Sequence, residues 1–518
     1  MPDSRPQVTP STAMIDALAD IQRGIEKEGL RVASDGSISQ TGHPEILGST
    51  LTHPSITTDY SESLLEFITP KQRGVEETID YLSDLHSFAL RNLGDEVVWP
   101  SSMPCAIEGD ESIPIALYGS SNVGQMKHVY RQGLGVRYGR IMQSIAGIHY
   151  NFSFPDEFWL AHQKHLGDTQ SLKDFKSEQY FSLIRNFRRY SWILHYLFGA
   201  SPVIDASFLD GQPHQLQTFA GNSLGLPFAT SLRMSDLGYK NSAQEDLKVS
   251  YNTLDEYTKT LGKAVHQSYA PYEEIGTQRD GQYIQLNTNI LQLENEYYSD
   301  IRPKRVTDSG EKPIHALDDR GVEYIEVRIL DINPFIAQGI NSEQIRFMDA
   351  FLIHCLISQC PLQSTSTCSE IKTNQSNVIM RGRDPELMME QDGEQVPLNV
   401  AANQMLDCIS KAAAMLDQAN QTKLYLAAAT AQRAKVADST STPSGRIMAL
   451  VESGEEFLDL NKRLADQHKA YFTHADNTQL PDAKMRELAA KSLVEQADME
   501  SNDVISFDQY LAAYNEAD

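Results

Sequence analysis

The sequence predicts an α+β protein that is built around an antiparallel sheet. Short segments in which apolar and polar residues alternate are typical of strands with one buried face. These segments are interleaved with helical segments, but they lack the regular strand–helix–strand repeat of a parallel sheet. From about residue 400 onward the pattern is helical and rich in alanine. We therefore expect a single domain over residues 1–518, with a strand-rich core at about 20–340 and a mostly helical part at about 341–518.

The first expected elements follow from the spacing of the apolar residues. Residues 12–22 have helical spacing, whereas residues 25–32 change to a period of two and predict a strand. An amphipathic helix is expected over residues 75–93. Further strands are expected over residues 147–154, 283–291 and 322–330.

The later elements are predicted to be helices. Asn341 with Gln344 is typical of a helix start, which predicts a helix over residues 342–360. The acidic stretch at residues 492–518 contains enough apolar residues for a docked helix end, and a disordered acidic tail is the alternative.

The composition excludes several classes of partner. The chain has 70 acidic and 44 basic residues and a net charge of −26, which argues against wrapping nucleic acid or adhering to an anionic membrane. No secretory signal and no apolar run of about 20 residues is visible. The five cysteines are odd in number and form no CxxC motif, so we expect reduced thiols and a cytoplasmic protein.

Metal-ligand residue types recur on the polar faces of the expected strands. Because side chains alternate along a strand, Glu26 shares a face with Glu28, and Glu326 shares a face with Arg328. The other two segments place on one face His149 with Asn151 and Ser153, and Gln285 with Asn287 and Asn289. Either these faces meet water, or they form the concave face of a curved sheet that binds cations.

The second interpretation favours a divalent cation. Two carboxylates about 4 Å apart repel by about 4 kcal/mol at an effective dielectric constant of about 20. A cluster of carboxylates therefore needs a counter-charge, and oxygen ligands with one histidine favour Mg²⁺ or Mn²⁺ over zinc.

The common nucleotide-binding motifs are absent. The sequence contains no GxxxxGK[ST] and no GxGxxG, which disfavours P-loop and Rossmann binding. A bound nucleotide would need metals and basic side chains, for which Arg302, Lys304 and Arg305 are candidates. The alternative for these three residues is a solvated basic loop.

Several long motifs, taken together and in order, resemble one family. They are GIEKEGLRV (24–32), TGHPEILGSTLTHPSITTDYSESLLEFITP (41–70), WPSSMPC (99–105), YGSSNVGQMKHVYRQGL (118–134), MQSIAGIHYNFSFP (142–155), FGASPV (198–203), ATSLRMSDLGY (229–239), LQLENEYYSDIRPKR (291–305) and GVEYIEVRILDINPF (321–335). The chain resembles the proteobacterial type of glutamate–cysteine ligase, also called gamma-glutamylcysteine synthetase. The resemblance is dense from about residue 20 to 340.

The resemblance implies a fold and a reaction. The fold is glutamine-synthetase-like, with an antiparallel sheet curved around a funnel-shaped site and surrounded by helices. The reaction joins the gamma-carboxylate of L-glutamate to the amine of L-cysteine through a gamma-glutamyl phosphate at the expense of ATP, as the first step of glutathione biosynthesis. Mg²⁺ is the expected metal, with Mn²⁺ as the alternative. We also expect feedback inhibition by glutathione and a monomer.

The resemblance also implies roles for individual residues. Glu326 and Arg328 are the expected catalytic pair, with Arg328 on the transferring phosphoryl group, and Arg233 is expected to hold glutamate. The matching metal ligands are Glu26, Glu28, Asp59, Glu66, His149 and Glu326. The matching residues around the cysteine pocket are Tyr60, Tyr130, Gln143, Tyr239 and Tyr298.

Two positions depart from the family pattern. Gly29 stands where threonine is expected, which predicts a looser strand, and Tyr60 stands where phenylalanine is expected beside the thiol pocket. The tyrosine hydroxyl predicts a wetter pocket with altered selectivity among small amino acids. The competing functions are a two-metal phosphohydrolase, which also clusters carboxylates with histidine, and a non-catalytic metal-binding protein.

Overall fold

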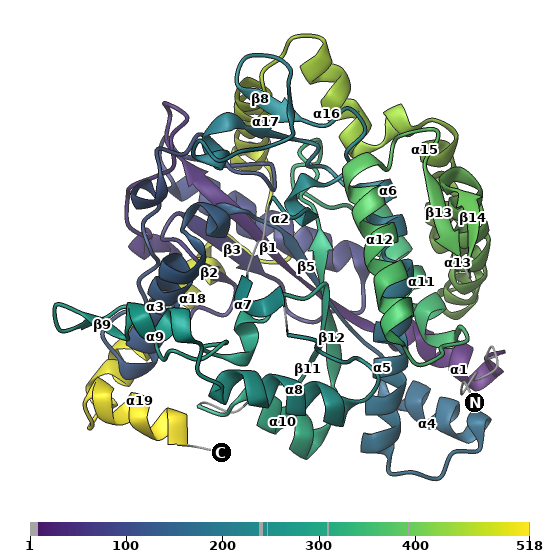
Figure 1. Ribbon diagram of the computed structural model, residues 1–518, viewed down its shortest axis with the longest axis horizontal. Helices are drawn as coiled ribbons and strands as arrows, with labels where there is room; N and C mark the ends of the chain where they lie inside the picture. The colour runs from purple at the N-terminus through teal and green to yellow at the C-terminus, as the bar shows by residue number, and fades with distance from the viewer. Residues whose placement is uncertain (1–8, 238–241, 246, 308–309, 392, 517–518) are drawn as a thin grey trace.

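A seven-stranded antiparallel sheet crosses the middle of the molecule (Figure 1). The computed structural model describes residues 9–516, apart from 238–241, 246, 308–309 and 392. The strand order is β11-β12-β5-β1-β3-β2, with β4 also paired to β1. The strands are β1 (Gln22–Val32), β2 (Ile56–Thr58), β3 (Leu64–Ile68), β4 (Val97–Val98), β5 (Ile148–Ser153), β11 (Ile301–Lys304) and β12 (Tyr324–Leu330).

The remaining strands of the described chain form small peripheral sheets. A three-stranded sheet contains β6 (Val203–Asp205), β7 (Gln217–Thr218) and β8 (Ser223–Gly225). The two hairpins are β9 (Gln278–Arg279) with β10 (Gln282–Tyr283), and β13 (Met388–Gln391) with β14 (Glu394–Pro397).

Helices surround the central sheet (Figure 1). Those before residue 341 are α1 (Thr12–Ala17), α2 (Val75–Asn92), α3 (Asn122–Tyr138), α4 (Asp156–Leu166), α5 (Leu172–Tyr190), α6 (Trp192–Phe198), α7 (Ser242–Glu245), α8 (Leu254–His266), α9 (Ala270–Ile275) and α10 (Pro313–Arg320). Those after it are α11 (Ser342–Ile357), α12 (Thr365–Arg381), α13 (Leu398–Asn420), α14 (Leu424–Ala431), α15 (Arg433–Ala437), α16 (Pro443–Glu452), α17 (Phe457–His474), α18 (Asp482–Asn502) and α19 (Phe507–Glu516). Among the described residues, no helix is both long and apolar enough to cross a membrane.

The expected alternation is confirmed in three of the four strand segments. Glu26 pairs with His149 across β1 and β5, and Glu28 pairs with Glu66 across β1 and β3, so these residues share the polar face. On the opposite face, apolar side chains such as Ile25, Ile148, Tyr150, Phe152, Ile325 and Val327 are buried. The sheet therefore has one apolar face in the core and one polar face.

The prediction of a strand over residues 283–291 is wrong. Only Gln282–Tyr283 forms a strand, and the following residues run as bends. Gln285 is fully buried, and its Nε2 donates to the carbonyl oxygens of Tyr272 and Gly276 at 3.2 and 2.8 Å. Gln285 Oε1 also accepts Arg137 Nε at 2.8 Å, so contacts with distant residues fix this side chain, and local alternation does not encode them.

The main helix expectations are confirmed with shifted ends. The helix expected over 75–93 is α2, and Asn341 caps α11 by accepting the backbone N–H of Gln344 at 2.9 Å. The first helix, α1, is shorter than expected, because a 3₁₀ turn follows it and β1 begins at Gln22. The helical pattern beyond residue 400 appears as α13 to α19.

The acidic C-terminal stretch ends in a docked helix. Leu511 on α19 is buried in a small apolar cluster with Met126 and Val129 of α3. The hydroxyl of Tyr283 donates to Asp508 on α19 at 2.7 Å. The described part of this stretch is therefore packed against the domain.

A buried ion pair fixes the apolar side of the sheet to α11. Arg23 on β1 meets Asp349 on α11 at 2.9 Å, and both side chains are at most 1% exposed. The hydroxyl of Tyr150 on β5 donates to the same carboxylate at 2.6 Å. Because buried charges need complete compensation, this cluster makes the α11 contact specific.

We predict that Asp349→Asn strongly destabilises the fold. The substitution leaves the Arg23 charge buried without its partner, which costs about 3–5 kcal/mol of unfolding free energy. The urea midpoint measures this loss. Asp255→Asn in the exposed pair with Lys259 is the control and should leave the midpoint almost unchanged. Equal midpoints for both variants would contradict the prediction.

Candidate active site

A cavity of about 930 Å³ opens on the polar face of the central sheet. Strands β1, β3, β5, β11 and β12 contribute to its floor, and α3 and the segment 295–298 contribute to its walls. It contains most of the residues that the sequence singled out. Those are Glu26, Glu28, Asp59, Tyr60, Glu66, Tyr130, Gln143, His149, Arg233, Tyr298, Arg302, Lys304, Glu326 and Arg328.

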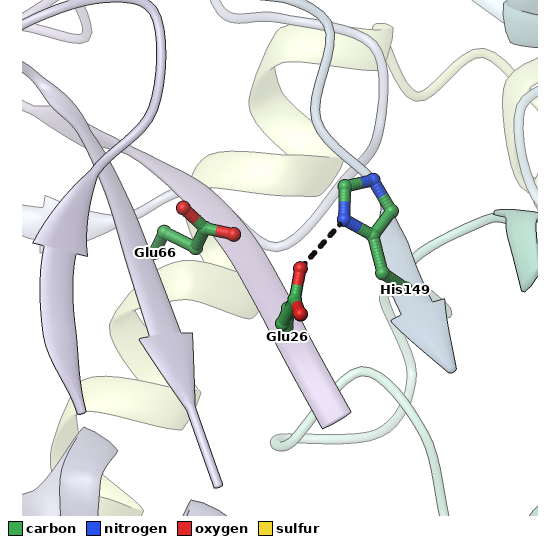
Figure 2. A group of neighbouring side chains, drawn as sticks. All are labelled: Glu26, Glu66 and His149. Carbon is green, nitrogen blue, oxygen red and sulfur yellow. Dashed lines mark hydrogen bonds and ion pairs between the residues drawn. The ribbon is translucent and has the colours of Figure 1, made fainter. Parts of the chain in front are cut away.

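Glu26, Glu66 and His149 form the centre of this cavity floor. One ligand atom of each lies within 4.8 Å of the others, and the three side chains point toward one another from three adjacent strands (Figure 2). His149 Nδ1 lies 3.1 Å from a Glu26 carboxylate oxygen. The antiparallel register places these residues side by side although they are far apart in the sequence.

Two further glutamates surround the same histidine. Glu28 lies 3.7 Å from His149 Nε2, and Glu326 lies 3.6 Å from His149 Nδ1. Asp59 lies in the same cavity and pairs with Arg131 at 3.8 Å. The six predicted metal ligands therefore line one cavity, and four glutamates among them surround the histidine.

The charges of the glutamates are unevenly compensated. Burial raises the pKa of Glu66 well above its usual range, and the nearby Glu26 and Asp59 raise it further. Although burial opposes ionisation of Glu26, its hydrogen bond with His149 holds that pKa below the usual value. Burial raises the pKa of Glu28. The cluster thus has more negative charge than its protein neighbours neutralise, which is the environment that suits a divalent cation.

Three positively charged side chains lie beside the glutamate cluster. Glu326 is approached by Arg328 at 3.0 Å, by Lys304 at 3.6 Å and by Arg302 at 4.0 Å. Burial opposes ionisation of Glu326, but Lys304 and Arg328 hold its pKa well below the usual value. The Nε atoms of Arg328 and Arg233 are buried without a hydrogen-bond partner among the protein atoms. Both side chains line the cavity, so their positive charges act on an anionic ligand there.

Arg305 lies outside this cavity. It lines an adjoining cavity of about 310 Å³, and its guanidinium donates to the carbonyl oxygens of Arg320 and Gly321. Arg302 and Lys304 line both cavities. The adjoining cavity also has apolar walls, which include Tyr257, Leu261, Ile314, Leu317 and Tyr324.

Four of the five residues expected around the cysteine pocket line the main cavity. They are Tyr60, Tyr130, Gln143 and Tyr298, whereas Tyr239 lies outside the described residues. Tyr60 is buried, and its hydroxyl lies 2.6 Å from the position that a Cβ at Gly135 would occupy. The extra hydroxyl therefore fits because residue 135 is a glycine.

Gly29, which stands where threonine is expected, was predicted to loosen its strand, but the strand is regular there. Gly29 pairs regularly with Leu65 inside β1, and a Cβ at this position would lie 2.6 Å from Val98 Cγ1. The strand is continuous at Gly29, and a larger residue would require Val98 to move.

Sequence reasoning missed several residues that line the cavity. Arg131 follows the predicted Tyr130 and stacks on the Tyr118 ring at 4.5 Å. Glu296 accepts hydrogen bonds from Arg137 and Tyr138, which joins α3 to the segment that carries Tyr298. Lys372 reaches the cavity from α12, and no local pattern distinguishes it from an ordinary exposed helix residue.

Comparison with known proteins identifies the family. A sequence model described as glutamate-cysteine ligase matches residues 8–378. A glutamate–cysteine ligase of Pseudomonas aeruginosa is 50% identical over 505 residues, which cover 97% of this chain and 96% of the relative. The ligase of Hahella chejuensis is 52% identical over 505 residues, with 96% of each chain covered.

Solved structures confirm the expected fold. The glutamate–cysteine ligase of Francisella tularensis in complex with AMP is similar with a TM-score of 0.90 and 37% identity, covering 96% of this chain and 98% of that one. A bifunctional glutathione synthetase of Pasteurella multocida has a TM-score of 0.70 and 26% identity, covering 89% of this chain and 54% of that one. The chain therefore belongs to the glutamate–cysteine ligase family.

Proposed function

We propose that the cavity on the polar face of the sheet is the site where this ligase joins the gamma-carboxylate of L-glutamate to the amine of L-cysteine with ATP as co-substrate. The observation that carries the proposal is the cluster of Glu26, Glu66 and His149, with ligand atoms within 4.8 Å, in a cavity that Arg328 and Arg233 also line. Family membership and the AMP complex of the Francisella relative support nucleotide use.

The chemistry requires strong charge compensation. A carboxylate is a poor electrophile, so ATP first converts it to gamma-glutamyl phosphate, and the cysteine amine then displaces phosphate. Both steps bring anionic groups together in a cavity that is already lined by seven carboxylates. Cations and arginine side chains are therefore needed wherever negative charge develops.

The donor set fits a hard divalent cation, with Mg²⁺ as the expected ion and Mn²⁺ as the alternative. The residues that would hold it are Glu26, Glu28, Asp59, Glu66, His149 and Glu326. When bound, such an ion neutralises phosphate oxygens and polarises the transferring phosphoryl group. The raised pKa of Glu66 supports this fit, since a cation would supply the missing counter-charge.

The cationic side chains have separate roles. Arg328 shares the cavity face of β12 with Glu326 and is placed to contact the transferring phosphoryl group through its planar guanidinium. Arg302 and Lys304 line both cavities and would hold the phosphate chain between them. The adjoining cavity, with its apolar walls and Arg305, is the proposed nucleoside subsite.

The amino acids occupy the other end of the cavity. Arg233 lines the cavity and binds the glutamate substrate through the charge of its guanidinium. The proposed cysteine pocket is lined by Tyr60, Tyr130, Gln143 and Tyr298, and Arg131 adds a positive charge to the same wall. Feedback inhibition by glutathione follows from this arrangement, because its glutamyl part resembles the substrate.

We further propose a cytoplasmic monomer, and the five free thiols agree with a reducing compartment.

We predict that ADP release requires the metal and both amino acids. With Mg-ATP and glutamate, we expect rapid release of ADP only when cysteine is also present. EDTA should abolish this release until Mg²⁺ or Mn²⁺ is restored. A coupled ADP assay measures both effects. Hydrolysis that is indifferent to glutamate and cysteine would favour the phosphohydrolase alternative instead.

We predict that Glu26→Gln and Glu326→Gln each lower kcat by about 100-fold or more, because each removes a negative ligand from the cation site. Steady-state rates at saturating Mg-ATP measure the loss. The matched control is Glu487→Gln, which removes an exposed carboxylate that pairs with Lys484 outside the cavity lining. Retained rates with weaker metal binding would instead support a non-catalytic metal-binding protein.

We predict that Arg328→Lys lowers kcat by about 100-fold while the KM values for glutamate and cysteine change little, because the planar geometry is lost although the charge remains. Initial rates against each substrate measure this separation. Arg463→Lys, in the exposed pair with Glu455, is the control. If only the KM for glutamate increased, the proposed roles would be reversed: Arg328 would bind glutamate and Arg233 would contact the phosphoryl group.

A further inference from the structure

A fully buried carboxylate, Asp331, lies directly behind Arg233. It follows the end of β12, and its side chain is 0% exposed. One oxygen accepts the Ala200 N–H at 2.7 Å and the Ser201 hydroxyl at 2.6 Å, and the other accepts the Ser231 hydroxyl at 3.0 Å. Arg233 Nη1 lies 3.7 Å from the second oxygen. Both carboxylate oxygens are thus fixed in direction.

Asp331 connects three segments that meet at the cavity. The Ser201 segment and the Ser231 segment pair with each other, and the Leu232 N–H donates to the Ser201 carbonyl at 2.6 Å. The second segment carries Arg233, whereas β12 carries Glu326 and Arg328. The Asp331 carboxylate therefore connects the loop that carries Arg233 to the strand that carries Arg328.

The Arg233 guanidinium is held in a narrow position. Its Nη2 donates to the Arg328 carbonyl at 3.0 Å, and its Nη1 donates to the Leu330 carbonyl at 3.5 Å. A Cβ at Gly147 would lie 2.1 Å from Nη2, so the guanidinium occupies space that only glycine leaves open. These contacts use Nη1 and Nη2 and leave Nε without a protein partner.

A second negative charge competes for this arginine. Arg233 lines the same cavity as Glu28, and the two side chains attract each other electrostatically. Asp331 is the buried acid within 4 Å of Arg233 in the described structure, so its negative charge opposes that attraction. Arg233 thus lies between the metal-site carboxylates and Asp331.

We propose that Asp331 is a positioning residue that holds the Arg233 guanidinium against the end of β12, so that the arginine keeps one orientation toward the glutamate substrate and does not pair with Glu28. This inference rests on the proposed role of Arg233 in glutamate binding. Asp331 itself touches neither substrate nor metal, because it is not part of the cavity lining.

The test is Asp331→Asn, which removes the charge and keeps the shape. We expect the KM for glutamate to rise about tenfold, while kcat at saturating glutamate and the KM values for ATP and cysteine change by less than about threefold. A merely structural role would change all parameters together or lower the melting temperature without a selective effect. An unchanged glutamate KM in a folded variant would overturn the inference.

Arg233→Met separates this inference from the proposed function. If Asp331 acts through Arg233, the double variant Asp331→Asn/Arg233→Met should have the same glutamate KM as Arg233→Met alone. Additive effects would overturn the inference. If Arg233→Met itself left the glutamate KM unchanged, the proposed glutamate site would be wrong and the inference would fall with it.

A second variant covers the case in which Asp331→Asn does not fold. Ser201→Ala/Ser231→Ala keeps the charge but removes the two hydroxyl groups that direct the carboxylate. We expect the glutamate KM to rise by about threefold or more with the other KM values retained, whereas no selective change would overturn the inference. The matched control is Ser207→Ala. The Ser207 hydroxyl accepts the backbone N–H of Ile107 and does not contact Asp331.

Discussion

The fold is organised around the mutual repulsion between carboxylates on one face of the central sheet. Glu26, Glu66 and Glu326 lie around His149 on adjacent antiparallel strands, and the charge of Glu66 is not compensated by the protein alone. Holding them together requires a sheet that cannot relax. The buried apolar face provides that stiffness, and Arg23 with Asp349 fixes it to α11.

The same constraint explains the division of charge within an acidic protein. The net charge of −26 would by itself repel ATP and glutamate. Within the cavity, however, Arg131, Arg233, Arg302, Lys304 and Arg328 lie beside the glutamates. The acidic residues can hold cations, and the basic residues offer donors to anions, so the cavity suits anionic substrates although most of the surface does not.

The helical part supports the site from outside. The carbonyl of Ile379 on α12 accepts the backbone N–H of Thr230, in the loop that carries Arg233, at 2.9 Å. Lys372 on α12 lines the cavity, and α19 packs on α3, which carries Tyr130 and Arg131. The family model ends at residue 378, so α19 lies beyond the matched region while it packs against a cavity wall.

Side-chain alternation is a local property with a two-residue period, so the amino-acid sequence is enough to show which residues share a strand face. It groups Glu26 with Glu28 and Glu326 with Arg328, it places His149 on a polar face, and its long motifs indicate the family. Which of these faces meet depends on the tertiary structure. Strand register, the approach of Lys372 from α12 and the position of Asp331 behind Arg233 depend on contacts between residues far apart in the chain. The failed strand at 283–291 has the same cause, since Gln285 is fixed by long-range packing that local alternation does not encode.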